Sequence, residues 1–215
     1  MVTTSNIVSS LMPEVQEIRK RIDGLRSYPH RYALQFQYLT GSRVSEVCGK
    51  YAVSGKDFTI QKYKDDLAVI FTVKTAKREG RERDIAIPLG SKYESWSSDL
   101  ADYFEKYKHR KKMFNFSTRT LQNYGKKLFK NMEYTIEKYV LKGRTYGFHK
   151  RNICTHGLRH VRATELLTVY GFDMLDLTIF MGWTLKTGVK TAPQVIDRYI
   201  YKQWVRYFPK LLKLR

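Results

Sequence analysis

Apolar residues recur at helical spacing over the first forty positions. In residues 13–25 they lie three or four apart, at Val15, Ile18, Ile22 and Leu25. Pro13 suits a first helical turn, so this spacing predicts a helix over 13–25. A second helix is expected over 30–39, after Pro29 and before Thr40-Gly41. Ser42 is the expected N-cap of a third helix over 43–51.

The pattern then changes to one typical of strands. Three runs are β-branched or alternating: 57–62 (DFTIQK), 67–74 (LAVIFTVK) and 83–88 (RDIAIP). Turn-prone segments separate them, and the second of these, residues 75–81, is basic. A small three-stranded antiparallel sheet is predicted.

Helical spacing returns after Pro88. Helices are predicted over 95–110, 118–132, 155–170, 174–181 and 193–204. The chain of 215 residues is therefore expected to form one mostly helical α+β domain, with no repeat or low-complexity linker.

The amino-acid composition indicates the kind of molecule that the protein binds. Forty Lys and Arg against 20 Asp and Glu give a net charge of +20, and 42% hydrophobic residues suffice for a core. Such an excess of positive charge favours a polyanion such as DNA. The densest charged run, 108–112 (KHRKK), is interpreted as a solvated helix end. The sequence shows no membrane span or secretory signal, and two cysteines provide no disulfide framework. A soluble, cytoplasmic protein is expected.

Two segments could carry phosphate chemistry. In YLTGSRVSEV, a glycine before a helix start places Arg43 where it could face an anion, or where it could simply pair with Glu46. In THGLRHVRATELL, His156 and Arg159 share a helix face, and His160 lies one turn from His156. Arginine neutralises a phosphate and histidine moves a proton. No metal site is expected, because no Glu follows His156 and no third ligand is evident.

These segments, with a later MGW and a C-terminal tyrosine, resemble the catalytic domain of the tyrosine recombinase (phage-type integrase) family. TGSRVSE resembles its first arginine box, HGLRH its HxxR box and MGW its GH or GW dipeptide, in matching order over residues 34–201. The composition, rich in Tyr and Lys and poor in Cys, is similar to that of integrases from archaeal viruses and plasmids.

The resemblance implies a site-specific recombinase that cleaves and rejoins DNA through a 3′-phosphotyrosine, without metal, ATP or other cofactor. The implied catalytic residues are Arg43, Lys74, His156, Arg159, Trp183 and Tyr199. Lys77 is the alternative to Lys74 as the hairpin lysine, and Tyr201 the alternative to Tyr199 as nucleophile. Further DNA contacts are expected from Lys77, Arg78, Arg81, His160, Lys186 and Lys190.

The implied partners are double-stranded DNA and further copies of the chain, as a homotetramer on DNA. Only 42 residues precede Arg43, too few for the helical DNA-clamping domain of relatives, so a truncated chain is expected. The tail 202–215 could dock on a neighbouring protomer or pack on its own domain. Two rival functions share the same features: a DNA-binding module of this fold that does not cut, and a type IB topoisomerase.

Overall fold

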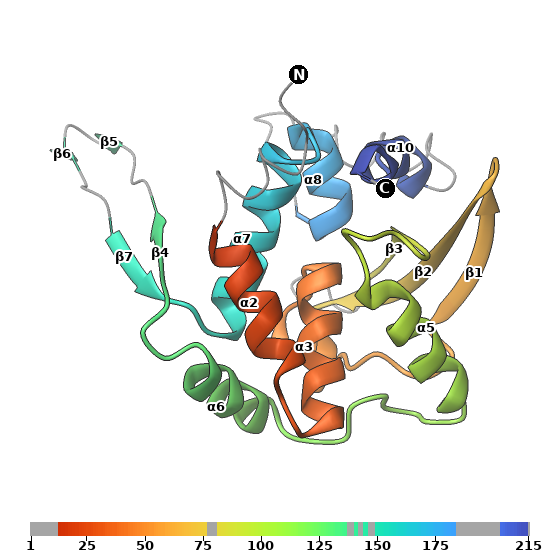
Figure 1. The fold of residues 1–215 in the computed structure, drawn as a ribbon, viewed down its shortest axis with the longest axis horizontal. Coiled ribbons are helices and arrows are strands. Elements are labelled where there is room, and N and C mark those ends of the chain that lie inside the picture. The colour runs from red at the N-terminus through yellow and green to blue at the C-terminus, as the bar shows by residue number, and fades with distance from the viewer. Residues whose placement is uncertain are drawn as a thin grey trace.

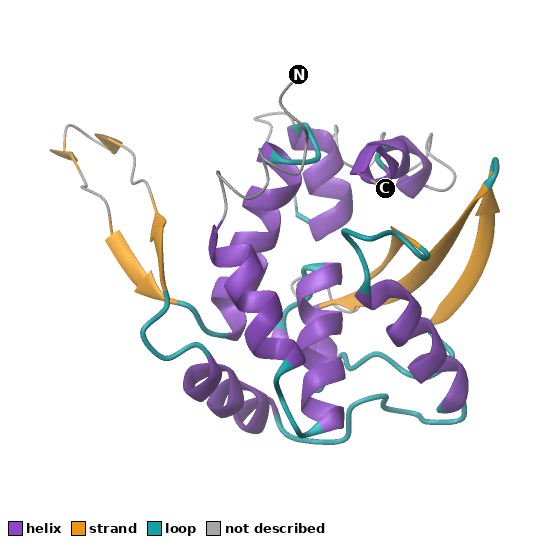
Figure 2. Cartoon of the chain, in the orientation of Figure 1, coloured by secondary structure: helices purple, strands orange, loops and turns teal. Residues whose placement is uncertain are grey.

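Helices pack against one small antiparallel sheet in the computed structural model (Figures 1 and 2). The structure describes residues 13–76, 81–136, 140–141, 144–145, 149–183 and 203–214. The expected α+β class is confirmed.

The sheet contains three strands in the order β1-β2-β3, as predicted. They are β1 (Phe58–Tyr63), β2 (Asp66–Thr75) and β3 (Arg81–Pro88). In β2 the central residues 68–71 are buried. Phe36 and Phe104 pack on Phe71 from one face of the sheet, and Trp204 and Phe208 pack beside Tyr63 on the other. In the register, Val73 lies opposite Arg83 and Thr75 opposite Arg81.

The first two predicted helices are confirmed as α2 (Pro13–Asp23) and α3 (Tyr28–Thr40). The third is much shorter than predicted: α4 covers Val44–Val47 only, and its N-cap is Arg43 rather than Ser42. The Ser42 side chain is unavailable for capping, because it is buried with its Oγ 2.7 Å from Thr40 Oγ1. Instead the Glu46 carboxylate accepts a hydrogen bond from the Arg43 backbone N–H, 2.9 Å away.

The later helices follow the predicted order with earlier ends. They are α5 (Trp96–Lys106), α6 (Thr118–Leu128), α7 (Thr155–Thr168) and α8 (Met174–Met181). Only α8 has the predicted bounds. Asp173 caps it by accepting the N–H groups of Leu175 and Asp176. Of the helix predicted over 193–204, residues 193–202 lie outside the described part, and Trp204 belongs to a 3₁₀ helix, η2 (Gln203–Arg206).

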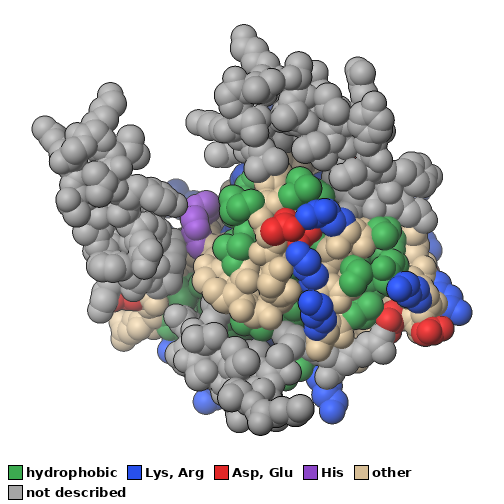
Figure 3. Space-filling view, turned by 90° about the horizontal axis from the view of Figure 1, so that it is seen from above, with side chains coloured by type: hydrophobic (Ala, Val, Ile, Leu, Met, Phe, Trp, Pro, Cys, Tyr) green, Lys and Arg blue, Asp and Glu red, His purple; other side chains and the backbone are tan. Residues whose placement is uncertain are grey.

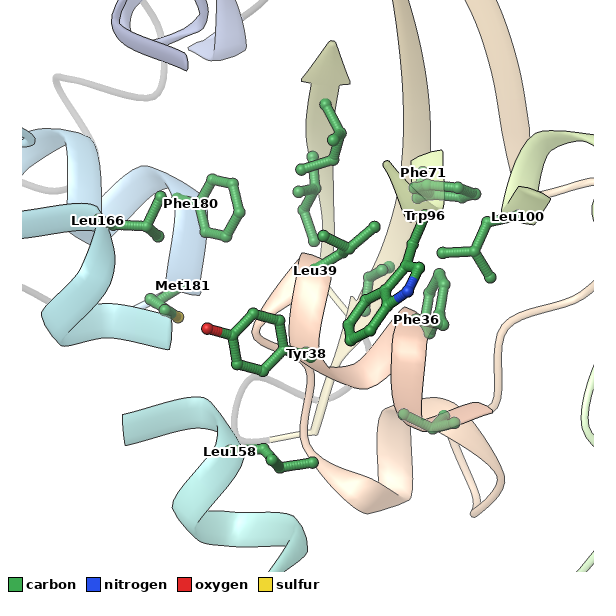
Figure 4. Close-up of a cluster of buried hydrophobic side chains, with 14 of the residues drawn as sticks. Phe36, Tyr38, Leu39, Phe71, Trp96, Leu100, Leu158, Leu166, Phe180 and Met181 are labelled. Carbon is green, nitrogen blue, oxygen red and sulfur yellow. The ribbon is translucent and has the colours of Figure 1, made fainter. Parts of the chain in front are cut away.

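Aromatic and aliphatic side chains from these elements form one core (Figure 4). Phe36 of α3 packs edge-on against Phe71 of β2, with ring centroids 5.2 Å apart. From the other side, Leu158 and Leu166 of α7 and Phe180 of α8 close the core. The apolar residues of the helices thus meet those of the sheet in one core.

The tail packs on its own chain, which is one of the two predicted alternatives. It continues from η2 into α10 (Phe208–Leu211) and a final 3₁₀ turn, η3 (Leu212–Leu214). Trp204, Phe208 and Leu211 are buried, whereas Val205 is exposed. The Tyr207 hydroxyl accepts the Ala86 N–H at 2.9 Å, which ties the tail to β3.

A buried ionic network joins α2, α7 and the segment before α5. Arg162, which is fully buried, lies 2.6 Å from Glu165 and 2.9 Å from Glu94. Arg19 approaches Glu165 to 3.6 Å, and the Tyr38 hydroxyl donates to the same carboxylate at 3.0 Å. Two guanidiniums therefore meet two carboxylates, and the group is neutral.

Two additional pairs of strands were not predicted. Between α6 and α7 the chain forms β4 (Glu133–Ile136), β5 (Val140–Leu141), β6 (Arg144–Thr145) and β7 (His149–Asn152). β4 pairs with β7 and β5 with β6, both antiparallel. These strands extend away from the rest of the molecule in Figure 1.

Candidate anion site

Glu46 is the carboxylate around which the candidate site is arranged. It is fully buried, and its oxygens accept the Arg43 guanidinium at 2.8 Å and the Ala76 N–H at 3.1 Å. Burial alone would raise the pKa of Glu46, but the Arg83 charge and the N–H donors of Arg43 and Ala76 outweigh it and lower the pKa. Glu46 is therefore ionised, and it ties α4 to the end of β2.

Arg43 pairs with Glu46, which was one of the two interpretations of its position in the sequence. Its side chain is still about one fifth exposed, at 18%. The backbone at Arg43 is extended, since the helix begins at Val44. Arg43 thus lies at the edge of the site, held by Glu46 and reachable from solvent.

Arg159, one turn into α7, is buried and donates to two backbone carbonyls. One is that of Gly41, and the other is that of Met181, 2.5 Å away. Burial lowers the pKa of Arg159 to about 9, and the charges of Arg83 and Arg43 act in the same direction, against Glu46. The guanidinium therefore lies in an environment that already has too much positive charge.

The glycines beside Arg159 are required by this close packing. Gly41 ends α3 with a φ of 59°, and a Cβ there would lie 2.6 Å from Met181 Sδ. Gly182 ends α8 with a φ of 63°, and its Cβ would lie 2.8 Å from Arg83 Cδ. Both positions combine a left-handed backbone with contact to the site, so a larger residue would move the arginines.

Arg83 belongs to the site and was missed by the sequence analysis. It is buried on β3, donates to the Phe180 carbonyl, and lies 3.4 Å from Glu46. Its Nε is buried and has no hydrogen-bond partner among the residues that the structure describes. A signal existed in the sequence: Arg83, Ile85 and Ile87 alternate on one strand, which places a charged residue at an inward position.

Two guanidiniums therefore contact one carboxylate, and a third lies close by. Arg43 and Arg83 both contact Glu46, and Arg159 lies close enough to have its pKa lowered by both. The three cations and one anion leave two positive charges in excess. Such a cluster, hereafter the arginine cluster (Arg43, Arg83, Arg159 and Glu46), is completed electrostatically by a dianion or a polyanion.

His156 and His160 are exposed on the first turns of α7. Their Nε2 atoms lie 3.1 Å apart, and the ring centroids 4.8 Å apart. His156 precedes Arg159 by three residues, so the two share a helix face, as the spacing predicted. A histidine and a buried arginine are thus brought to the same end of α7.

Trp183 follows Gly182 directly and is half-buried against the core. Its ring centroid lies 5.9 Å from the Arg159 guanidinium carbon. The MGW segment therefore reaches the arginine cluster, as its position in the predicted site requires.

The structure does not bring Lys74 to the cluster. Val73 and Thr75 are buried on β2, and Lys74 between them is exposed. Arg83 lies opposite Val73, while Lys74 lies opposite Glu82. Because side chains alternate along a strand, Lys74 lies on the face of the sheet away from Arg83.

Of the expected DNA contacts, Arg81 is exposed at the start of β3, opposite Thr75 and thus on the cluster's face. Several predicted residues lie outside the described part of the chain: Lys77, Arg78, Lys186, Lys190, Tyr199 and Tyr201. Their assignments stay predictions.

Within the described ranges, no three His, Cys, Asp or Glu side chains are placed to hold a metal ion. None of the helices described has both the length and the apolar character needed to cross a bilayer. On the face shown in Figure 3, Lys and Arg side chains are scattered among apolar ones. Comparisons with protein-family models, curated proteins and solved structures find no match.

Proposed function

We propose that the protein is a DNA strand transferase of the tyrosine recombinase type, acting as a site-specific recombinase or integrase. The observation that supports this most is the arginine cluster, in which Arg43 and Arg159 come from distant segments yet meet beside Glu46. Two excess positive charges at a partly exposed position suit a phosphodiester whose negative charge grows in the transition state.

The reaction conserves the energy of the phosphodiester in a covalent bond. The phenolic oxygen of Tyr199 forms a bond to phosphorus, and the bond from phosphorus to the 5′-oxygen breaks. The products are a 3′-phosphotyrosine and a free 5′-hydroxyl. Rejoining reverses the step, so neither ATP nor a metal is required.

His156 is the proposed general base, since the phenol must lose its proton to attack. It is exposed at the start of α7, three residues before Arg159, so it can reach a phenol approaching the cluster from solvent. Trp183 would contribute an indole N–H to a phosphate oxygen and pack against the substrate.

The departing 5′-oxygen needs a proton, and a hairpin lysine is the proposed donor. Lys74 was the first choice from the resemblance, but it lies on the face of the sheet away from Arg83. This placement favours Lys77 as the acid.

Covalent trapping tests the proposal directly. The chain is incubated with a nicked suicide duplex containing its recombination site, and denaturing gels reveal any protein–DNA adduct. We expect an adduct that Tyr199→Phe abolishes while DNA affinity changes by only a few-fold. Tyr201→Phe is the matched control, because it removes the same hydroxyl two residues away.

The outcomes separate the rival functions. DNA binding with no adduct on any site-containing duplex would show a binding module that does not cut. An adduct together with relaxation of supercoiled DNA, and no exchange between two sites, would show a topoisomerase. Recombinant product from two sites supports the proposal.

A further inference from the structure

Tyrosines of α3 and α5 form a row of rings where these two helices meet. The Tyr32 and Tyr103 rings are stacked, with centroids 4.3 Å apart and an interplanar angle of 22°. The Tyr107 ring meets the Tyr103 ring edge-on, with centroids 4.9 Å apart. The start of α3 at Tyr28 and the end of α5 at Lys106 both lie on the lower side of the molecule in Figure 1. The row therefore runs along one side of the protein.

Arginine guanidiniums extend this row at both ends. The guanidinium carbon of Arg31 lies 4.5 Å from the Tyr28 ring centroid and 5.5 Å from that of Tyr32. At the other end, the guanidinium carbon of Arg110 lies 3.7 Å from the Tyr107 ring centroid. A cation is attracted to the negative face of an aromatic ring, which holds each guanidinium in place. These side chains form one continuous surface, hereafter the tyrosine–arginine surface (Tyr28, Arg31, Tyr32, Tyr103, Tyr107 and Arg110).

Solvent reaches the tyrosine–arginine surface. Tyr28 is 61% exposed, and the other five residues of the surface are partly exposed. Tyrosine rings and guanidiniums are both planar, so the parts of them that face solvent can stack with another planar group. The surface therefore offers several stacking positions in a row.

Lysines beside this surface make its surroundings cationic. Residues 102–112 contain five Lys and Arg against two carboxylates, a net charge of +3. One of the carboxylates, that of Glu105, lies 3.3 Å from Lys108 in an exposed ion pair. Like charges so close in sequence repel one another, and a bound polyanion removes that repulsion. The exposed lysines of this segment are Lys106, Lys108, Lys111 and Lys112.

The combination of planar groups and cations indicates a single-stranded nucleic acid. Unpaired bases can stack on tyrosine rings and on guanidiniums, while the phosphates between them pair with lysines. In a duplex the bases are stacked on one another, and an acidic protein segment has no bases, so either would use the cations alone. We propose that the tyrosine–arginine surface binds single-stranded nucleic acid, with bases on the rings and guanidiniums and phosphates on the neighbouring lysines.

This proposed site is separate from the arginine cluster and does not rest on the proposed cleavage. The surface includes Tyr28, the first residue of α3, whereas the carbonyl of Gly41, just after the last residue, accepts from Arg159. At about 1.5 Å per residue, the two sites lie roughly 20 Å apart along the helix axis. The protein could therefore hold one strand at this surface while the cluster contacts another.

A pair of probes separates stacking from charge. Fluorescence anisotropy measures the affinity for a labelled oligothymidylate of about ten nucleotides and for an abasic oligonucleotide of the same length, which keeps the phosphates and removes the bases. The stacking variant is Tyr28→Leu with Tyr107→Leu, because leucine keeps apolar volume and removes the planar ring. Its control is Tyr63→Leu on β1, where the Lys64 Nζ lies 5.8 Å from the ring centroid.

A second pair of variants tests the cations. The charge variant is Lys106→Gln, Lys111→Gln and Lys112→Gln. Unfolding midpoints near that of the wild type show that a variant folds, and Tyr28→Leu alone replaces the stacking variant if the double substitution unfolds. The control for charge removes three exposed lysines elsewhere: Lys62→Gln, Lys92→Gln and Lys213→Gln.

We expect the wild type to bind the oligothymidylate about tenfold more tightly than the abasic probe, because one stacked base contributes about that much. The stacking variant should lose this preference, and Tyr63→Leu should keep it. The charge variant should bind both probes more weakly. It should lower the slope of log affinity against log salt by about two, since each phosphate contact on a single strand contributes ~0.7, and its control should lower the slope by less than one.

Equal affinity of the wild type for the two probes would overturn the proposal, because the surface would then attract anions of any kind. A preference for the oligothymidylate that the stacking variant retains would also overturn it, since the bases would then stack elsewhere. Equal salt slopes in the charge variant and its control would place the phosphates away from this segment and reject the site. All of these variants leave the arginine cluster intact, so the covalent adduct is scored on the same proteins, and its presence or absence leaves these outcomes unchanged.

Discussion

Glu46→Gln is the substitution that most directly examines the electrostatics of the arginine cluster. The change keeps the shape of the side chain and removes its charge. The carboxylate accepts from Arg43 at two atoms and from Ala76, and it lies 3.4 Å from Arg83. Without it, three guanidiniums would face one another with no anion between them.

The size of the effect follows from burial. Glu46 and Arg83 are both buried, and removing one partner of a buried ion pair costs about 3–5 kcal/mol. For a chain of this length that corresponds to a fall in Tm of roughly 6–20 °C. An exposed pair offers the comparison: Glu17 lies 2.7 Å from Arg21 with 42% of its side chain exposed, so Glu17→Gln should lower Tm far less than Glu46→Gln.

The assay is thermal unfolding in chloride and in sulfate at equal ionic strength. An anion that binds the folded chain, and is present at a concentration a hundred times its Kd, stabilises the fold by about 2.7 kcal/mol. Because Glu46→Gln leaves one more positive charge unbalanced, sulfate should stabilise this variant more than the wild type. In the Glu17→Gln control, sulfate should act as it does on the wild type.

The stabilisation of the fold by Glu46 depends on pH in a defined direction. The pKa of Glu46 is lowered on folding, so its stabilisation is complete above the ordinary glutamate pKa and is lost as the pH falls through the lower folded value. The difference between wild type and Glu46→Gln should therefore be full at pH 7 and shrink in acid. A loss below 1 kcal/mol at pH 7, or an equal response to sulfate in both proteins, would refute the description of the cluster as an uncompensated cationic site.

Four further substitutions extend these expectations. Arg159→Ala should slow single-turnover cleavage of a suicide substrate by ~10²-fold with little loss of DNA affinity, and equal losses would make Arg159 an ordinary phosphate clamp. Lys77→Ala should cleave normal DNA slowly but a 5′-phosphorothiolate duplex at nearly the wild-type rate, since a thiolate leaves without a proton. Lys74→Ala should affect neither substrate, and the reverse pattern would assign the proton to Lys74. Arg162→Met should lower the unfolding free energy in urea by about 3–5 kcal/mol, because the buried carboxylates of Glu94 and Glu165 would then share the single positive charge of Arg19. A cost below 1 kcal/mol would contradict the network.

The order of helices and strands could be predicted because each buries one periodic face. β2 is an example: its apolar run and its flanking turn residues gave the strand almost to the residue. The prediction of the third helix was wrong at its start because several side chains compete to cap a helix. Ser42 has a hydroxyl that could cap the helix, but this hydroxyl is buried and accepts a hydrogen bond from Thr40 instead. The Glu46 carboxylate, from within the helix, accepts the Arg43 N–H in its place.

Strands β4 and β7 were missed for a different reason. Their sequences give little strand signal, because β7 (HKRN) has no apolar residue and the alternation in β4 (EYTI) covers only four positions. Only the pairing of Tyr134 with Arg151 and of Thr135 with Lys150 defines them, and pairing is invisible in a single strand. For Arg83, the alternation along the strand indicated an inward position. Its partner Glu46 could not be predicted, because it lies far away in the sequence.

The chain contains two buried arginine–glutamate groups, and their charge balance distinguishes their roles. The group around Glu165 contains two guanidiniums, those of Arg19 and Arg162, and two carboxylates, those of Glu94 and Glu165. Burial opposes the charge of Arg162, but the carboxylates outweigh it and raise the pKa. Around Glu46 the guanidiniums are in excess, and burial together with the charges of Arg83 and Arg43 lowers the pKa of Arg159 to about 9. A balanced group needs nothing further and stabilises the fold, whereas an unbalanced one remains costly until an anion arrives. The excess of positive charge beside Glu46 is therefore the physical basis for the phosphate binding that we propose.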